Sequence, residues 1–211
     1  MNAEIPKQFL LLAGQPILMH TIRIFSRFDP GMLLFVTLPE HHIPYWEELC
    51  RYHTFIIPHS LVKGGKTRFG SVKNALEKIS GDGLVAIHDG VRPLVSIDTL
   101  KRTFAEAGKS GNAIPVIRMQ ESIREAGPGG NREVARENLR IVQTPQVFRK
   151  ELIKKAYRSA PHENFTDDAT VLETLGEIIH LVEGNPENIK ITRPFDLRCA
   201  ESILGFSGLQ D

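Results

Sequence analysis

The chain has 211 residues, of which 41% are hydrophobic and 24% are charged, so it is long enough for one substantial domain with a buried core. Its formal net charge of +1 excludes a surface built to wrap nucleic acid, and any phosphate site must be a local cluster of cations. No apolar run is long enough to cross a membrane and none resembles a signal peptide, so we expect a cytoplasmic protein without a membrane partner.

Short apolar runs alternate with amphipathic segments along the chain, and the runs are bounded by glycine, proline or aspartate. The runs expected to be buried strands lie at 32–38, 55–57, 84–88, 113–117 and 178–182. Apolar spacing of helical period predicts helices over 16–28, 71–79, 97–107, 150–158, 167–175 and 194–204. This alternation predicts an α/β fold with a doubly wound, mostly parallel sheet and a ligand crevice at the carboxyl ends of its strands.

Residues 118–144 break the alternation. They contain the turn cluster Gly127-Pro128-Gly129-Gly130-Asn131 between two polar segments, which predicts a protruding β-arm on a single domain that spans 1–211. Because an exposed arm has unpaired strand edges, a second subunit is one way to cover it.

The start of the chain also departs from a doubly wound sheet. Residues 1–9 read as a loop, and no apolar strand with a glycine-rich, phosphate-holding turn precedes them. The first strand and the glycine-rich loop are therefore expected to be absent from this chain.

Asp89 follows the apolar run that ends at His88, so its carboxylate is expected at the ligand crevice. Carboxylate oxygen suits Mg²⁺, which usually completes its shell with substrate phosphates and water. Gly90 allows a ligand to approach the backbone, and Arg92 suits a phosphate or an ion pair. An aspartate that caps the turn after the strand explains the same residues, and both interpretations stay open.

A glycine pair and a basic stretch, Gly64 to Arg68, lead into the helix expected from residue 71. Backbone N–H groups at the start of a helix favour phosphates or polar base edges, and Ser71 offers a hydroxyl group to a base. A plain glycine turn is the alternative. Lys7, Lys190 and Arg136, each taken alone, are typical of solvated surface charges.

Several short motifs, in their order, resemble the 2-C-methyl-D-erythritol 4-phosphate cytidylyltransferase family of the non-mevalonate isoprenoid pathway. The resemblance extends from Met1 to about Leu204. No single motif is decisive, but their order is specific. The motifs are Pro6-Lys7-Gln8-Phe9, Gly64-Gly65-x-x-Arg68-x-x-Ser71-Val72, His88-Asp89-Gly90-x-Arg92-Pro93, Thr144-Pro145-Gln146 and Asn188-Ile189-Lys190-x-Thr192.

The resemblance implies a Rossmann-like fold with a β-arm, and a reaction in which a sugar-alcohol phosphate attacks the α-phosphorus of CTP and pyrophosphate leaves. It implies catalytic roles for Lys7, which stabilises the transition state, and for Lys190, which positions the acceptor phosphate. Gly65 and Ser71 fall on the part of the family site that recognises cytosine, and Gly90 lies against the nucleotide.

Metal and acceptor residues are implied in the same way. Asp89 falls on the carboxylate that binds Mg²⁺ or another divalent cation, and Glu187 falls where the family often has an aspartate suggested as a second ligand. Ser122 falls on a threonine that contacts the acceptor, and Arg92 supports the loop or contacts the acceptor. Arg136 falls on an arm arginine that reaches the acceptor across a homodimer interface.

One departure from the family pattern concerns the first strand and its loop, which usually ends Gly-x-Arg-Met. Met1 falls on that methionine, and the arginine, a second stabiliser of the transition state, has no counterpart. Loss of a buried strand exposes apolar neighbours and leaves backbone groups unpaired, so we expect the chain as given to be inactive or nearly so.

Two alternatives to the methyl-erythritol interpretation remain. A cytidylyltransferase for ribitol 5-phosphate or a similar pentitol phosphate shares the CTP site and differs around Ser122, Arg136 and Lys190. The motif Asn188-Ile189-Lys190 and the arm arginine favour methyl-erythritol phosphate. An inactive relative that binds only nucleotide or a partner is the other alternative.

Overall fold

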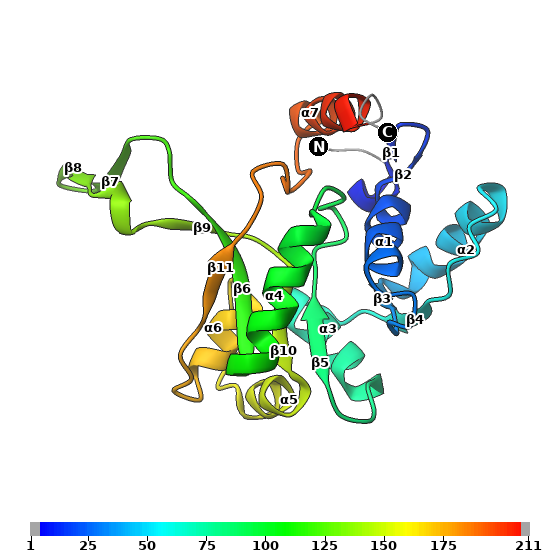
Figure 1. The fold of residues 1–211 in the computed structure, drawn as a ribbon, viewed down its shortest axis with the longest axis horizontal. Coiled ribbons are helices and arrows are strands. Elements are labelled where there is room, and N and C mark those ends of the chain that lie inside the picture. The colour runs from blue at the N-terminus through cyan, green and yellow to red at the C-terminus, as the bar shows by residue number, and fades with distance from the viewer. Residues whose placement is uncertain (1–4, 208–211) are drawn as a thin grey trace.

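The computed structural model describes residues 5–207, so Met1 lies outside the described residues. Figure 1 shows an α/β body from which a hairpin projects. The helices are α1 (Ile17–Phe28), α2 (Ile43–Tyr52), α3 (Arg68–Lys78), α4 (Ile97–Ser110), α5 (Lys150–Ser159), α6 (Asp168–Glu173) and α7 (Pro194–Ser207), with the 3-10 helices η1 (Lys7–Phe9), η2 (Glu40–His42) and η3 (Arg136–Asn138).

The main sheet has the strand order β11-β6-β10-β5, and β9 pairs with β6. Strand β11 is parallel to β6, whereas β10 is antiparallel to both β6 and β5, so β5, β6 and β11 run in one direction. The bounds are β5 (Leu84–Ile87), β6 (Asn112–Arg118), β9 (Arg140–Val142), β10 (Gln146–Arg149) and β11 (Leu181–Glu183). The predicted Rossmann-like α/β fold is confirmed in this arrangement.

The N-terminal part of the chain forms two smaller pairs. Strands β3 (Phe35–Leu38) and β4 (Ser60–Lys63) are parallel, and the short strands β1 (Leu11–Leu12) and β2 (Gln15–Pro16) are antiparallel. Phe9, which follows Lys7, stacks on the fully buried Trp46 with ring centroids 5.9 Å apart. The start of the chain is thereby fastened to α2.

Helices cover both faces of the main sheet. Successive residues of a strand point to opposite faces, so a strand that is apolar throughout needs a helix on each side. In β10, Val147 packs in a cluster with Ala107 of α4, whereas Phe148 packs in a cluster with Ile153 of α5 and Leu172 of α6. These residues are all buried, as expected for strands whose side chains are apolar on both faces.

A groove of about 800 Å³ separates β3 from β5. Apolar side chains line it, among them Phe25 of α1, Leu76 of α3, Val36 of β3 and Val85 of β5. No ladder pairs β3 with β5 anywhere in residues 5–207. One edge of β3 and one edge of β5 are therefore unpaired within the described residues, and side chains lie between the two strands.

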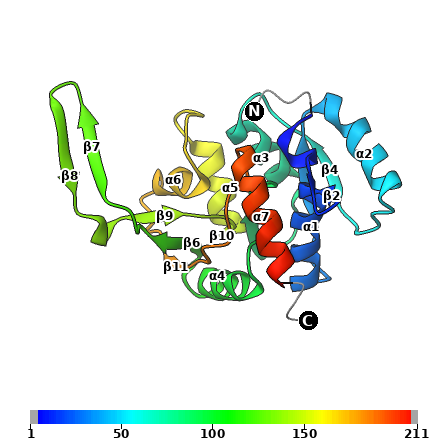
Figure 2. The same cartoon turned by 90° about the horizontal axis from the view of Figure 1, so that it is seen from above.

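The predicted arm is a two-stranded hairpin, β7 (Ile123–Gly127) paired with β8 (Gly130–Val134). It extends away from the body in both views (Figures 1 and 2). After η3 the chain returns to the main sheet through β9, which pairs with Val116, Ile117 and Arg118 of β6.

The strand predicted at 55–57 is wrong. Phe55 and Ile57 instead pack against the cluster around Trp46, while Ile56 between them is 85% exposed. The chain pairs with β3 only from Ser60, whose N–H donates to Leu34 O at 2.8 Å. Apolar residues at alternate positions thus fill the space beneath α2 without forming a ladder.

The prediction lacked α2 and β10, as well as the short strands β1, β2 and β4. Helix α2 has a proline in its first turn, which is a normal position for proline, but Trp46 is its only fully buried side chain. Strand β10 has four residues and runs antiparallel to its neighbours, so it lies outside a pattern of alternating parallel strands and helices. Within residues 5–207, no helix is both long and apolar enough to span a membrane.

Candidate active site

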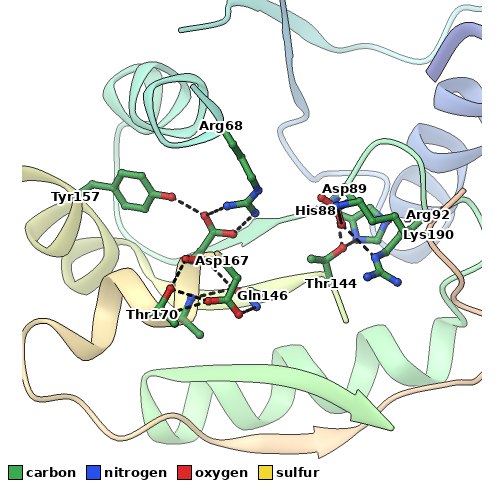
Figure 3. A network of polar contacts seen from close by, with 12 residues as sticks. Arg68, His88, Asp89, Arg92, Thr144, Gln146, Tyr157, Asp167, Thr170 and Lys190 are labelled. Carbon is green, nitrogen blue, oxygen red and sulfur yellow. Dashed lines mark hydrogen bonds and ion pairs between the residues drawn. The ribbon is translucent and has the colours of Figure 1, made fainter. Parts of the chain in front are cut away.

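Asp89 lies just beyond the carboxyl end of β5, where the sequence predicted it. Its Oδ2 is 3.1 Å from Arg92 Nε and 3.1 Å from Lys190 Nζ (Figure 3). Burial works to raise the pKa of Asp89, but the charges and hydrogen bonds of Lys190 and Arg92 lower it below its ordinary value. The carboxylate is therefore ionised at neutral pH, in a cluster with two cations.

His88 and Thr144 fix the backbone at Asp89. The N–H of Asp89 donates to Thr144 Oγ1 at 3.1 Å, and this oxygen lies 3.0 Å from His88 Nδ1. The hydroxyl of Thr144 thus donates to Nδ1, and we assign the ring hydrogen to Nε2, which is 3.0 Å from Arg92 O. Burial lowers the pKa of His88 to about 4, so the ring is neutral at pH 7.

Asn188, which is fully buried, joins Lys190 to this network. Its side-chain Nδ2 donates to Thr144 O at 2.8 Å, and its backbone carbonyl accepts from Arg92 Nη1 at 2.7 Å. The sequence named Asn188 and Thr144 only as parts of motifs. The position of these polar side chains beside proline or apolar residues was the only indication of a role. Their support of the Asp89 network depends on contacts between distant segments, which the sequence does not show.

The second predicted segment is a compact loop at the start of α3. Thr67 caps the helix by accepting from the N–H of Gly70 at 2.9 Å, and the N–H of Gly65 donates to Ser71 Oγ at 3.1 Å. A Cβ atom on Gly65 would lie 2.6 Å from the carbonyl carbon of Gly70, so only glycine fits there. The structure thus brings Gly65 and Ser71 together as predicted.

Lys7 is the first residue of η1, close in sequence to the groove. Its neighbour Gln8 lines the groove together with Asp89 and Gly90. Within residues 5–207 the Lys7 side chain forms no ion pair, so its ammonium group is available to a ligand. Gly90 is held from α1, because Thr21 Oγ1 donates to Gly90 O at 3.0 Å.

Ser122 and Arg136 stand apart from the Asp89 cluster. Both are exposed and lie at the two ends of the arm hairpin, next to β7 and after β8. Arg136 donates to the carbonyl of Gln120, which orients it along the base of the arm. No hydrogen bond or ion pair within the described part of the chain connects either residue to Asp89.

The donor set at Asp89 was compared with the needs of a divalent cation. Among residues 5–207, no three His, Cys, Asp or Glu side chains are grouped to hold a metal. Mg²⁺ commonly takes only one or two carboxylates and leaves the rest of its shell to phosphates and water. Asp89 Oδ1 makes no hydrogen bond in the described region, and the exposed Glu187 accepts only from Asn185, at 3.2 Å. These carboxylates fit an ion that is shared with a substrate.

Comparisons with known proteins show similarity to one enzyme family. Residues 1–206 match the family of 2-C-methyl-D-erythritol 4-phosphate cytidylyltransferases. The enzyme of that name from Bacteroides fragilis is 48% identical, over 97% of this chain and 93% of the relative. The one from Porphyromonas gingivalis is 47% identical, over 97% of this chain and 91% of the relative.

Solved structures are similar as well. The structure of 2-C-methyl-D-erythritol 4-phosphate cytidylyltransferase from Thermus thermophilus superposes with a TM-score of 0.82 at 33% identity, over 95% of this chain and 94% of that one. The Francisella tularensis enzyme gives 0.80 at 31% identity, over 94% and 93%. The resemblance inferred from the motifs is confirmed: the chain is a nucleotidyltransferase that belongs to the 2-C-methyl-D-erythritol 4-phosphate cytidylyltransferase family.

Proposed function

We propose that this chain transfers the CMP group of CTP to 2-C-methyl-D-erythritol 4-phosphate and releases pyrophosphate. The observation that carries the proposal is the cluster in which Asp89 Oδ2 lies 3.1 Å from both Lys190 and Arg92 at the end of β5. It combines a carboxylate suited to a cation with two cations suited to phosphates. The names of the relatives support the choice of acceptor.

The nucleotide is held between the start of α3 and the end of β5. Backbone groups near Gly65 and the hydroxyl of Ser71 recognise the cytosine edge, because they converge at the helix start. The Ser71 hydroxyl accepts from the N–H of Gly65 at 3.1 Å and donates to Thr67 O at 2.9 Å, so CTP takes over or shares these hydrogen bonds. Gly90 lies against the nucleotide. A Cβ atom at Gly90 would come within 3.1 Å of Leu18 Cδ1, so a larger residue would displace the turn toward the ligand.

A bound Mg²⁺ ion, or another divalent cation, neutralises charge on the triphosphate. Asp89 would hold this ion, and Glu187, from the segment that also carries Lys190, would be the second ligand. Asp89 is ionised at neutral pH because its two cationic partners outweigh the effect of burial on its pKa.

The acceptor phosphate attacks the α-phosphorus in line, and pyrophosphate leaves with the bonding electrons. Such a transfer depends on positioning and charge stabilisation more than on covalent chemistry. Lys7 offsets the charge that develops on the transferring group, since its side chain forms no ion pair within residues 5–207 and its neighbour Gln8 lines the groove. Lys190 positions the acceptor phosphate, and Arg92 and Ser122 contact the acceptor.

The protein acts as a homodimer in which Arg136 reaches the acceptor in the site of the partner subunit. The exposed arm supports this arrangement, because its hairpin has two open edges and most of its residues are exposed. Arg136 also makes no contact with Asp89 within its own described chain.

The decisive experiment measures pyrophosphate release with CTP and Mg²⁺ and with either 2-C-methyl-D-erythritol 4-phosphate or ribitol 5-phosphate as acceptor. We expect CTP-dependent turnover with the methyl-erythritol phosphate and none with ribitol 5-phosphate. Turnover with ribitol 5-phosphate would reassign the acceptor. CTP binding without turnover on either acceptor would identify an inactive relative and overturn the proposal.

A further inference from the structure

An ion pair between the first residues of α3 and α6 ties the nucleotide loop to a helix on the same face of the sheet. Arg68, the first residue of α3, places Nη1 2.9 Å from Oδ1 of Asp168 and Nη2 2.5 Å from Oδ2. Asp168 is the first residue of α6 and is completely buried, whereas the Arg68 side chain is 38% exposed. Two parallel hydrogen bonds between planar groups fix orientation as well as distance, so Arg68 is held in one position.

Asp168 is a rigid anchor for this contact. The hydroxyl of Tyr157 donates to Asp168 Oδ1 at 2.5 Å, and the buried Gln146 Oε1 accepts from the N–H groups of Asp168 and Ala169 at 2.9 and 2.8 Å (Figure 3). The anchor is therefore supported from α5 and from β10, and its carboxylate has no freedom to follow a moving arginine.

The same anchor is linked to the strand that presents Asp89. Gln146 stands opposite Ile87 in the antiparallel pair of β10 and β5, and Asp89 lies two residues beyond Ile87. A continuous path of hydrogen bonds and strand pairing thus runs from the end of β5 through Gln146 and Asp168 to Arg68.

Arg68 also faces the site electrostatically. Burial works to lower the pKa of Arg68, but hydrogen bonding and charge from Asp168, together with Tyr157 and Asp89, raise it above its ordinary value. Asp89 is the weakest of these influences, and the direct partner of Arg68 is Asp168. On the helix itself, Ser71 lies three residues after Arg68, which places the two on neighbouring positions of one helical face.

We propose that Arg68, fixed by Asp168, is a positioning residue that holds the loop from Gly65 to Ser71 at the correct reach from Asp89 to receive the nucleotide. This inference deepens the proposed function and rests on it, because that function makes the loop a nucleotide site. An ion pair that only stabilised the fold would affect the melting temperature without a specific effect on the loop. A positioning residue would also affect CTP binding and hydrogen exchange in the loop.

Two substitutions on the same carboxylate separate the roles. Arg68→Lys keeps the positive charge that Asp168 requires but removes the two-pronged geometry. Tyr157→Phe removes one hydrogen bond to Asp168 from the opposite side and leaves that geometry intact. The second variant is the matched control, and Asp168→Asn alone and combined with Arg68→Lys tests whether the two residues act as one unit.

The readouts are the Kd for CTP with Mg²⁺, amide hydrogen exchange across residues 65–71 without nucleotide, and the melting temperature of each full-length variant. We expect Arg68→Lys to raise the Kd for CTP about tenfold, which is about 1.4 kcal/mol, and to speed exchange in the loop at least as much. Tyr157→Phe should change both by less than about twofold, even with a comparable loss of melting temperature. The double variant should be no worse than Arg68→Lys alone.

Equal effects of Arg68→Lys and Tyr157→Phe on the Kd and on loop exchange would overturn the inference. Failure of the unsubstituted chain to bind CTP would instead count against the proposed function. Loop exchange needs no nucleotide, so in that case it alone decides whether Arg68 holds the loop.

Discussion

The ammonium group of Lys190 lies 3.1 Å from Oδ2 of Asp89, so residues from distant parts of the sequence form one ion pair at the end of β5. Arg92 binds the same oxygen from within the Asp89 turn. Asp89 is thereby kept ionised despite its partial burial, and its second oxygen accepts no hydrogen bond from the residues that the structure describes. The proposed chemistry depends on this pair more than on any other contact of the site.

Asp89→Asn should reduce turnover by at least about 100-fold, because an amide of the same shape cannot supply the charge that a divalent cation requires. The kcat and its dependence on Mg²⁺ concentration are the measurements. Asp98→Asn is the control, since Asp98 is exposed and pairs only with Lys101, at 3.5 Å. Activity of Asp89→Asn within about threefold of the unsubstituted chain would remove Asp89 from the proposed mechanism.

Gly65→Ala should weaken CTP binding by about tenfold or more, because the added methyl group would lie 2.6 Å from the backbone of Gly70 and force the loop apart. The Kd for CTP and the melting temperature should both change. Gly129→Ala, in the arm, is the matched control, because a Cβ atom there meets nothing within 4 Å. Normal CTP affinity in Gly65→Ala would show that the loop does not touch the nucleotide.

A mixed dimer of Asp89→Asn and Arg136→Ala chains should recover activity that neither variant has alone. If Arg136 acts across the interface, one of the two sites in the mixed dimer combines an intact Asp89 with the partner's intact arginine. Activity is measured after the variants are unfolded together and refolded, and the oligomeric state is checked by sedimentation. No recovery in a confirmed mixed dimer would place Arg136 in its own subunit's site.

Stability should fall between pH 6.5 and about pH 4, because the folded chain keeps His88 neutral with a pKa of about 4. The unfolded chain binds a proton near pH 6.5, so the stabilisation is full above that value and is lost as the pH falls to 4. For this shift it amounts to at most about 3 kcal/mol.

Urea unfolding at about pH 4.5 and pH 7 measures the effect of His88. The difference in the free energy of unfolding should shrink in His88→Gln and stay unchanged in His162→Gln, whose side chain is exposed. An equal difference in all three proteins would mean that other groups cause the pH dependence.

The elements that the sequence predicted well are those with a strong local pattern. The helix expected at 97–107 appears as α4, with Ser96 as its N-cap and Gly111 in the left-handed conformation at its end. The strand expected at 84–88 appears as β5. In both cases the burial pattern and the bounding residues agree, so no distant contact was needed to find them.

Where the prediction failed, contacts between distant segments decide the structure. The segment 55–57 has the composition of a strand, but its partners are side chains around Trp46.

In the site, Asp89, Arg92 and Lys190 were expected at one place and meet there. Asp168 gave no indication of its role, since a buried carboxylate that anchors Arg68 is recognised only when both helices are placed.

The open groove between β3 and β5 has a consequence for how the site works. Gln8, the neighbour of Lys7, and Asp89 both line it, and no ladder within residues 5–207 pairs β3 with β5. Side chains span the gap instead, including the bond of 3.0 Å from Thr21 to Gly90. Packed side chains permit small sliding and hinge movements that paired strands resist. The proposed charge-stabilising lysine and the proposed metal carboxylate are thus connected by side-chain packing, and not by strand pairing, within residues 5–207.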